Sequence, residues 1–257
     1  VERDELAPLL SYFEQRVREG VSAKSALKDV LQVVLASPSF LIRSEQSGPQ
    51  TDLAFPVTDW ELAGRLSYFL WASMPDDQLF RLAETNQLRE LGVLADQVDR
   101  MLRDPKARTL GSLFAAQWLG FIDLDRVRPG QIDNPWATDS LIKSMKQESA
   151  MLFNSLVQQN ASIDRLVDAD YTFVNEELAK HYGMQGVSGE HMQRVSLRDT
   201  PRRGVLGHGS VLAVTSFPGR TSPVIRGNWI LTRLLGTPPP PPPPNVSEFD
   251  ERVAENR

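Results

Sequence analysis

Residues 58–73, TDWELAGRLSYFLWAS, hold the sequence pattern that decides the fold class. Thr58 stands three residues before Glu61, which is the capping-box arrangement of a helix N-terminus. The apolar positions that follow recur at the helical spacing of i, i+4, i+7 and i+8, and they are Leu62, Leu66, Phe69 and Leu70. The stretch therefore predicts an amphipathic helix.

The same period recurs on both sides of this stretch. Residues 22–37, SAKSALKDVLQVVLAS, show it after a candidate N-cap at Ser22. Pro75 and Pro105 stand where a first-turn proline would begin a new helix, and Asp104 is the candidate N-cap of the second one. Further helices are predicted over residues 140–159, 163–167 and 175–182, and apolar segments follow at 205–214 and 223–235.

Strand signals are sparse. No alternating pattern recurs at the spacing of a sandwich or barrel, and residues 184–204, MQGVSGEHMQRVSLRDTPRRG, read as a loop with a brief strand-like patch. Residues 238–244 are seven consecutive prolines, which predict a polyproline II rod of roughly 20 Å. We therefore expect an all-α fold, mainly a helical bundle, with long loops and a C-terminal polyproline II segment.

Composition shifts divide the chain into four predicted parts. Residues 1–48 form an N-terminal helical hairpin that ends a preceding domain, and residues 56–185 form a central helical domain. Residues 186–237 form a loop plus a C-terminal helical domain, followed by a polyproline linker and tail over 238–257. The chain starts at Val1 without a signal-peptide pattern, so we expect a piece of a longer or processed polypeptide.

Composition also excludes several kinds of site. The 257 residues contain no cysteine, so the chain cannot form a disulfide, a thiolate zinc site, an iron–sulfur cluster or a covalent c-type haem attachment of its own. The formal net charge of −5 argues against a general nucleic-acid surface. No apolar run approaches the roughly 18 to 20 residues that span a bilayer, so no transmembrane segment is expected.

Three carboxylates are candidate catalytic groups. Glu148 lies three residues after Met145 and four before Leu152, near the apolar face of its helix, where burial raises a carboxyl pKa or demands a partner. An acid–base role and a structural ion pair with an arginine near the C-terminus are both open. Asp168 and Asp170 could pair in a hydrolase site, or could cap a helix starting after Tyr171.

A second group of residues suits anion or metal binding. Ser222 followed by Pro223 predicts a helix N-terminus, where free N–H groups attract anions. Arg220, Arg226 and Arg203 could add guanidinium groups there, to bind an anion or to hold buried carboxylates. His208 is a weak candidate metal or axial haem ligand, because no metal-binding spacing surrounds it. No nucleophile-elbow or phosphate-loop motif occurs.

Four motifs together resemble a known family. They are residues 31–45, LQVVLASPSFLIRSE; 61–79, ELAGRLSYFLWASMPDDQL; 168–183, DADYTFVNEELAKHYG; and 202–246, which contain GHGS and end in the prolines. They resemble the helical domains of unknown function of planctomycete-type multidomain cytochrome c proteins. The resemblance implies an exported protein, periplasmic or extracellular, and a haem c in an adjoining domain or chain that carries Cys-x-x-Cys-His. In that context the haem propionates could be received by Arg203, Arg220, Ser222 and Arg226.

This resemblance leads to our function hypothesis. The chain is expected to be a helical auxiliary module that positions a neighbouring haem domain and its electron-transfer partner, a c-type cytochrome domain or another redox protein. A polysaccharide or a membrane-associated complex is a further partner class. Two alternatives stay open: an oxidoreductase or glycan-active domain whose cleft holds the carboxylates and arginines above, and a protein-interaction module that uses the polyproline rod.

Overall fold

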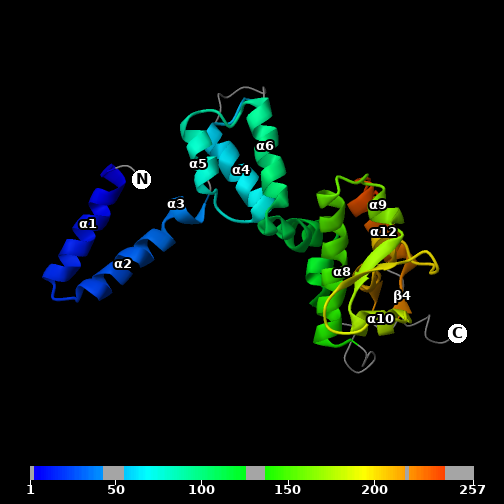
Figure 1. Ribbon diagram of the computed structural model, residues 1–257. Coiled ribbons are helices and arrows are strands. Elements are labelled where there is room, and N and C mark those ends of the chain that lie inside the picture. Colours follow the sequence, from blue (N-terminus) through cyan, green and yellow to red (C-terminus); the bar gives the residue numbers. More distant parts are fainter. Residues whose placement is uncertain (1–2, 43–54, 126–136, 218–219, 241–257) are drawn as a thin grey trace. The chain divides into compact units, whose positions relative to one another are not determined.

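The computed structural model describes residues 3–42, 55–125, 137–217 and 220–240 (Figure 1). These residues are mainly helical, as predicted, and the few strands form two small two-stranded sheets. In this part of the chain, no helix combines the length and the apolar character that a membrane span requires. Pro238 to Pro240 are exposed and non-helical, and the remaining prolines lie outside the described residues, so the polyproline II segment stays a prediction.

The chain divides into two compact units, Val1–Glu61 and Leu62–Arg257, which are described separately. The four-part division proposed from the sequence stays a prediction. The first unit contains α1 (Arg3–Arg18), α2 (Ala23–Ala36) and α3 (Pro38–Leu41). Ser22 caps α2, as predicted, by accepting the Ser25 N–H at 3.3 Å.

Helices α1 and α2 are joined by an ion pair from Arg16 Nε to Asp29 Oδ2 at 2.9 Å. Ala26 is the buried apolar residue that the structure shows in α2, whereas Leu27, Leu31 and Leu35 are about half exposed. The helical period of residues 22–37 is therefore correct, but within this unit the apolar face is not covered.

The boundary between the units falls in the first turn of α4 (Asp59–Trp71), and the second unit continues with α5 (Asp77–Glu84) and α6 (Leu91–Arg103). The capping box before α4 is confirmed: the Thr58 N–H donates to Glu61 Oε2 at 2.7 Å and the Glu61 N–H to Thr58 Oγ1 at 3.2 Å. Pro75 does not lie in the first turn of α5. Asp76 is the N-cap instead, because its carboxylate accepts the Leu79 N–H at 3.0 Å, which a proline cannot do.

A series of short helical turns of different kinds follows α6. It comprises the 3₁₀ turn η1 (Pro105–Arg108), the π-helical turn η2 (Leu110–Ala115), α7 (Ala116–Trp118) and the 3₁₀ turn η3 (Phe121–Asp125). Asp104 caps η1, as predicted, by accepting the Lys106 N–H at 2.8 Å. Gly111 brings η2 against α8 (Asp139–Gln158), where its N–H donates to Asn154 Oδ1 at 2.9 Å and a Cβ would overlap the Ala150 carbonyl oxygen.

Helix α8 matches the helix predicted over residues 140–159 to within one residue at each end. It is the central element of the second unit, and 11 of its residues are buried. Apolar side chains from α4 to α8 and from the C-terminal elements pack into one main core, with Leu70, Trp71, Leu79, Met101, Leu119, Phe121, Leu152 and Trp229 among its buried members.

One sheet was missed by the periodicity. After α9 (Arg165–Asp168), strand β1 (Tyr171–Val174) pairs antiparallel with β2 (Gln193–Ser196), and α10 (Glu176–Tyr182) lies between them in the sequence. The prediction that a helix starts after Tyr171 is thus wrong. The run Tyr-Thr-Phe-Val is β-branched and aromatic, which suits a strand, and Asn175 caps α10 by accepting the Leu178 N–H at 3.0 Å.

The C-terminal elements are η4 (Val205–Gly207), α11 (Gly209–Val214), β3 (Ser216–Phe217), β4 (Arg220–Thr221), α12 (Pro223–Trp229) and η5 (Ile230–Leu234). Two tryptophans tie this end to α7. Trp229 Nε1 donates to the Leu119 carbonyl at 2.9 Å, and Trp118 Nε1 donates to the Arg233 carbonyl at 2.7 Å. The backbone just before the prolines is therefore anchored to the core of the unit.

Candidate functional site

Glu148 is the centre of a buried polar cluster. Its side chain is 1% exposed and projects from α8 into the interior. Thr172 of β1 donates its hydroxyl to Glu148 Oε1 at 2.7 Å, and Tyr182 of α10 donates to Oε2 at 2.5 Å. Both carboxyl oxygens thus have a donor, and the donors are hydroxyl groups rather than the arginine side chains considered from the sequence.

His208 extends the cluster on the other side of Thr172. Its Nε2 lies 3.3 Å from Thr172 Oγ1, and its Nδ1 lies 2.9 Å from Ser149 Oγ. Ser149 in turn lies 2.6 Å from the hydroxyl of Ser210. We call these six residues, Glu148, Ser149, Thr172, Tyr182, His208 and Ser210, the Glu148–His208 cluster.

The contacts fix a direction for the hydrogen bonds when Glu148 is ionised. The Thr172 hydroxyl donates its one hydrogen to Glu148, so the Thr172 oxygen must accept a hydrogen bond from His208 Nε2–H. The Nδ1 atom of a neutral His208 then accepts from Ser149, and Ser149 accepts from Ser210. Every member of this chain is satisfied without a bound water or ion.

Burial controls the charge of both titratable groups. Desolvation raises the pKa of Glu148 to about 7, although the bonds from Tyr182 and Thr172 and the positive charge of Arg202 act in the opposite direction. Desolvation, together with the charge of Arg202, lowers the pKa of His208 to about 3. The 3.7 Å approach of His208 Nε2 to Glu148 Oε1 is therefore not an ion pair at neutral pH, because the imidazole is uncharged.

The backbone around His208 is shaped to admit Tyr182. The Gly209 N–H donates to the Tyr182 hydroxyl at 2.6 Å, and a Cβ at Gly209 would come within 2.9 Å of both that oxygen and Met145 Cε. Arg202 stacks on the Tyr182 ring, with its Cζ atom 3.8 Å from the ring centroid. The motif GHGS therefore serves close packing, and Gly209 is required for it.

The cluster contains the residue types of a serine–histidine–carboxylate triad, but its geometry does not suit catalysis. Ser149 and Ser210 are fully buried, so no substrate carbonyl can reach either hydroxyl in this conformation. Among the described residues, no group of three or more histidine, aspartate or glutamate side chains is arranged to hold a metal ion. What the arrangement does chemically is to lock α8, β1, α10 and the start of α11 together.

The other candidate carboxylates lie apart from Glu148. Asp170 accepts from Arg165 Nη2 at 2.8 Å and from Arg198 Nε at 3.1 Å, and Asp168 lies 3.5 Å from Arg165 Nη1. The bond from Arg198 is the main cause that lowers the pKa of Asp170. The two aspartates thus join arginines of neighbouring segments, and no contact in the described chain brings them to Glu148.

The candidate anion-binding residues are also separated. Ser222 caps α12, as predicted, by accepting the Ile225 N–H at 3.3 Å, and Arg226 Nε donates to Thr215 Oγ1 at 3.3 Å. Arg220 lies over the Phe217 ring at 4.7 Å from its centroid. Arg203 donates instead to the carbonyls of residues 197, 200 and 202, so its guanidinium clamps a loop. A haem-propionate role for these residues stays a prediction.

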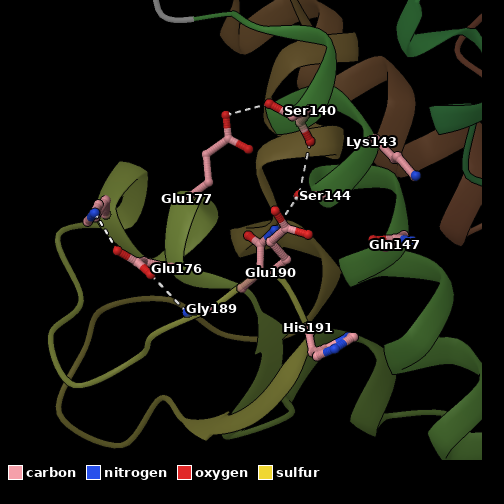
Figure 2. Close-up of a pocket in the computed structure, with 11 residues that line it drawn as sticks. Ser140, Lys143, Ser144, Gln147, Glu176, Glu177, Gly189, Glu190 and His191 are labelled. Atoms are coloured by element: carbon pink, nitrogen blue, oxygen red, sulfur yellow. Dashed lines mark hydrogen bonds and ion pairs between the residues drawn. The ribbon is translucent and has the colours of Figure 1, made fainter.

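A separate, open pocket lies beside α8 (Figure 2). It has a volume of about 690 Å³ and is lined by α8, by the start of α10 and by residues 189–191. Almost every lining side chain is polar; they are Ser140, Lys143, Ser144, Gln147, Asn175, Glu176, Glu177, Lys180, Glu190 and His191. The sequence analysis did not single out any of these residues.

Comparison with known families gives two matches. Residues 57–184 match the model of PSD4, a protein of unknown function (DUF1592), and residues 202–257 match the model of PSCyt3, a protein of unknown function (DUF1588). Both names are of the planctomycete cytochrome c type, which confirms the resemblance drawn from the motifs. No curated protein and no solved structure matches the chain.

Proposed function

Since the chain carries a DUF1592 domain and a DUF1588 domain, whose names associate them with cytochrome c, we propose that it is a helical module positioning a c-type haem domain and its electron-transfer partner. The observation that carries this proposal is the PSCyt3 match over residues 202–257. The name of that family refers to a cytochrome, and the matched residues include the proline run that would act as the spacer. An exported location, periplasmic or extracellular, belongs to the same proposal.

The haem must lie outside these 257 residues. Covalent attachment of a c-type haem requires cysteine, and the chain has none. Haem c therefore belongs to an adjoining domain or to an associated chain, and the present residues supply shape and support rather than axial ligands. His208, the one histidine considered as a ligand, has both ring nitrogens engaged inside the Glu148–His208 cluster.

The anchoring of the C-terminal segment supports a positioning role. The bonds from Trp118 to the Arg233 carbonyl and from Trp229 to Leu119 hold the last helical turn against α7. Gly236 then ends this turn with φ +63°, and the Thr237 N–H donates to the Leu231 carbonyl at 2.9 Å, as in a Schellman-type C-cap. A stiff proline segment that starts from a fixed base would hold its far end at a set distance.

The test compares the 257-residue chain with the native protein that contains it. We expect the chain alone to be colourless, and the native protein or its stable complex to show the visible spectrum of a c-type haem and a matching intact mass. A native protein with no haem in any covalently joined or associated polypeptide would overturn the proposal. Replacing residues 238–244 with an equally long glycine–serine segment should slow electron transfer, whereas an equally stiff replacement should not.

A further inference from the structure

We propose that the pocket between α8, α10 and residues 189–191 binds a small organic ammonium that also carries hydroxyl groups, such as an amino sugar. The pocket belongs to the same helix as the Glu148–His208 cluster but shares no residue with it. The proposal is independent of the haem partner proposed above.

The pocket wall is held in place by its own hydrogen bonds. Glu177 Oε1 accepts from the hydroxyls of Thr138 and Ser140, each at 2.8 Å. Asn175 caps α10 with its side-chain oxygen and donates from Nδ2 to Ser144 at 2.9 Å, so α10 is fixed to α8. A ligand would therefore meet a preformed surface and would not have to order it.

Glu176 fixes the wall of the pocket that residues 189–191 form. Its Oε2 accepts the Gly189 N–H at 2.8 Å, its backbone N–H donates to the Gly189 carbonyl at 3.0 Å, and its Oε1 pairs with Lys180 Nζ at 2.6 Å. The bond from Lys180 is the main cause that lowers the pKa of Glu176. Both oxygens of the Glu176 carboxylate are therefore engaged within the pocket wall, and this carboxylate is not available to a ligand.

Two other acceptors remain open to the pocket. Glu177 Oε2 and both carboxyl oxygens of Glu190 have no donor among the described residues. Glu190 is exposed on residues 189–191, while Glu177 lies on α10 across the pocket (Figure 2). Acceptors that lie on two walls of a pocket suit a ligand with several donor hydrogens, of which a primary ammonium is the strongest.

The charge balance also favours a cation. Glu176 and Lys180 neutralise each other, which leaves Glu177 and Glu190 against the single positive charge of Lys143. In Figure 2 the Lys143 side chain extends to the side away from Glu177. The two free carboxylates repel an anionic ligand.

The neutral side chains of the pocket lining favour a ligand that carries hydroxyl groups. Gln147 and His191 line the pocket without a protein partner in the described chain, and each can both donate and accept a hydrogen bond when the imidazole is neutral. A volume of about 690 Å³ lies within the ordinary range of small-molecule sites. A hydroxylated ammonium satisfies the carboxylates and these neutral groups together, whereas a bare alkylamine leaves the neutral groups to water.

The test is an NMR titration of the isotope-labelled 257-residue chain with glucosamine, N-acetylglucosamine, glucose and inorganic phosphate, at about pH 7 so that most of the free amine is protonated. We expect glucosamine to shift amides of α8, α10 and residues 189–191. N-acetylglucosamine and glucose should bind at least about tenfold more weakly, because they lack the charge-assisted hydrogen bonds.

Variants locate the site and separate charge from fold. Glu190→Gln and Glu177→Gln should each weaken glucosamine binding about tenfold, and Lys143→Gln should leave it unchanged or strengthen it. Glu190 is exposed and unpaired, so Glu190→Gln should preserve the amide spectrum elsewhere. The proposal is overturned by the absence of glucosamine binding, by equal binding of N-acetylglucosamine, by binding that survives Glu190→Gln, or by stronger shifts with phosphate.

Discussion

The buried face and the pocket face of the second unit around α8 use carboxylates in opposite ways. On the buried face, Glu148 accepts hydrogen bonds at both oxygens and is closed to solvent. On the pocket face, Glu177 and Glu190 keep oxygens without a donor in the described chain and lie open to solvent. Helix α8 thus contributes both to a satisfied polar cluster and to the wall of a pocket that holds unsatisfied acceptors.

The difference shows how burial decides the role of an acidic residue. A buried carboxylate must be satisfied by donors or take up a proton, and Glu148 has a donor at each oxygen while desolvation raises its pKa to about 7. It has no free capacity for a ligand, and its contribution is to stability and to the uniqueness of packing. An exposed carboxylate contributes little to folding and keeps its capacity to bind.

The largest expected effect is on the buried face. Glu148→Ala leaves the hydroxyls of Thr172 and Tyr182 without an acceptor and creates a cavity, so it should lower the free energy of unfolding by about 3 kcal/mol. The matched change Glu177→Ala, on the pocket face, should cost less than about 1 kcal/mol. Urea denaturation of both variants measures the contrast, and equal losses would show that the two faces are not distinct.

The second prediction concerns pH. Glu148 keeps its proton in the folded state up to about pH 7 but loses it near its ordinary pKa of 4.5 when unfolded, so its stabilising contribution falls as pH rises between these values. His208 behaves in the opposite sense. It stays neutral in the folded state down to about pH 3 but takes up a proton below 6.5 when unfolded, so stability falls as pH decreases through that window.

Between pH 4.5 and 6.5 the two slopes should cancel in the wild-type protein, since each amounts to about 1.4 kcal/mol per pH unit. Glu148→Gln should therefore become more stable as pH rises across this window, and His208→Gln less stable, both measured as differences from wild type by urea denaturation. Parallel pH profiles for the three proteins would contradict the raised and lowered pKa values.

The smallest predicted effect tests a single hydrogen bond on each face. Thr172→Val keeps the shape of the side chain but removes the donor to Glu148 and the acceptor for His208, and should cost about 1.5 kcal/mol. Ser140→Ala, which removes one exposed donor to Glu177, should cost less than about 0.5 kcal/mol. Thr172→Ser keeps the hydroxyl and should therefore keep most of the stability that Thr172→Val loses, as measured by thermal or urea unfolding. If Thr172→Ser is as unstable as Thr172→Val, the loss comes from packing and not from the hydrogen bonds.

Periodicity and caps predicted the helices well because both are local. The apolar spacing of residues 140–159 and the capping boxes and N-caps at Thr58, Ser22 and Ser222 all depend on residues within one or two turns. Strand β1 was not predicted, because its partner β2 lies about 20 residues further along the chain and each strand has only four residues. Pairing over that distance depends on contacts that no local window contains.

The site was predicted in part for the same reason. Glu148 stood out because a carboxylate on an apolar helix face is locally anomalous, and His208 stood out within GHGS. Thr172, Tyr182 and Ser149 are ordinary residues in their own segments, and only the packing of α8 against β1, α10 and α11 brings them together. Arg203 and Asp170 look like binding groups in the sequence, but neighbouring carbonyls and arginines occupy them.

The bond between Ser149 and His208 joins segments that the family comparisons treat as separate. Ser149 lies within the PSD4 match and His208 within the PSCyt3 match, and their contact is fully buried. Tyr182 and Gly209 join the same two segments. A boundary drawn near residue 200 would therefore cut through a packed core of this chain.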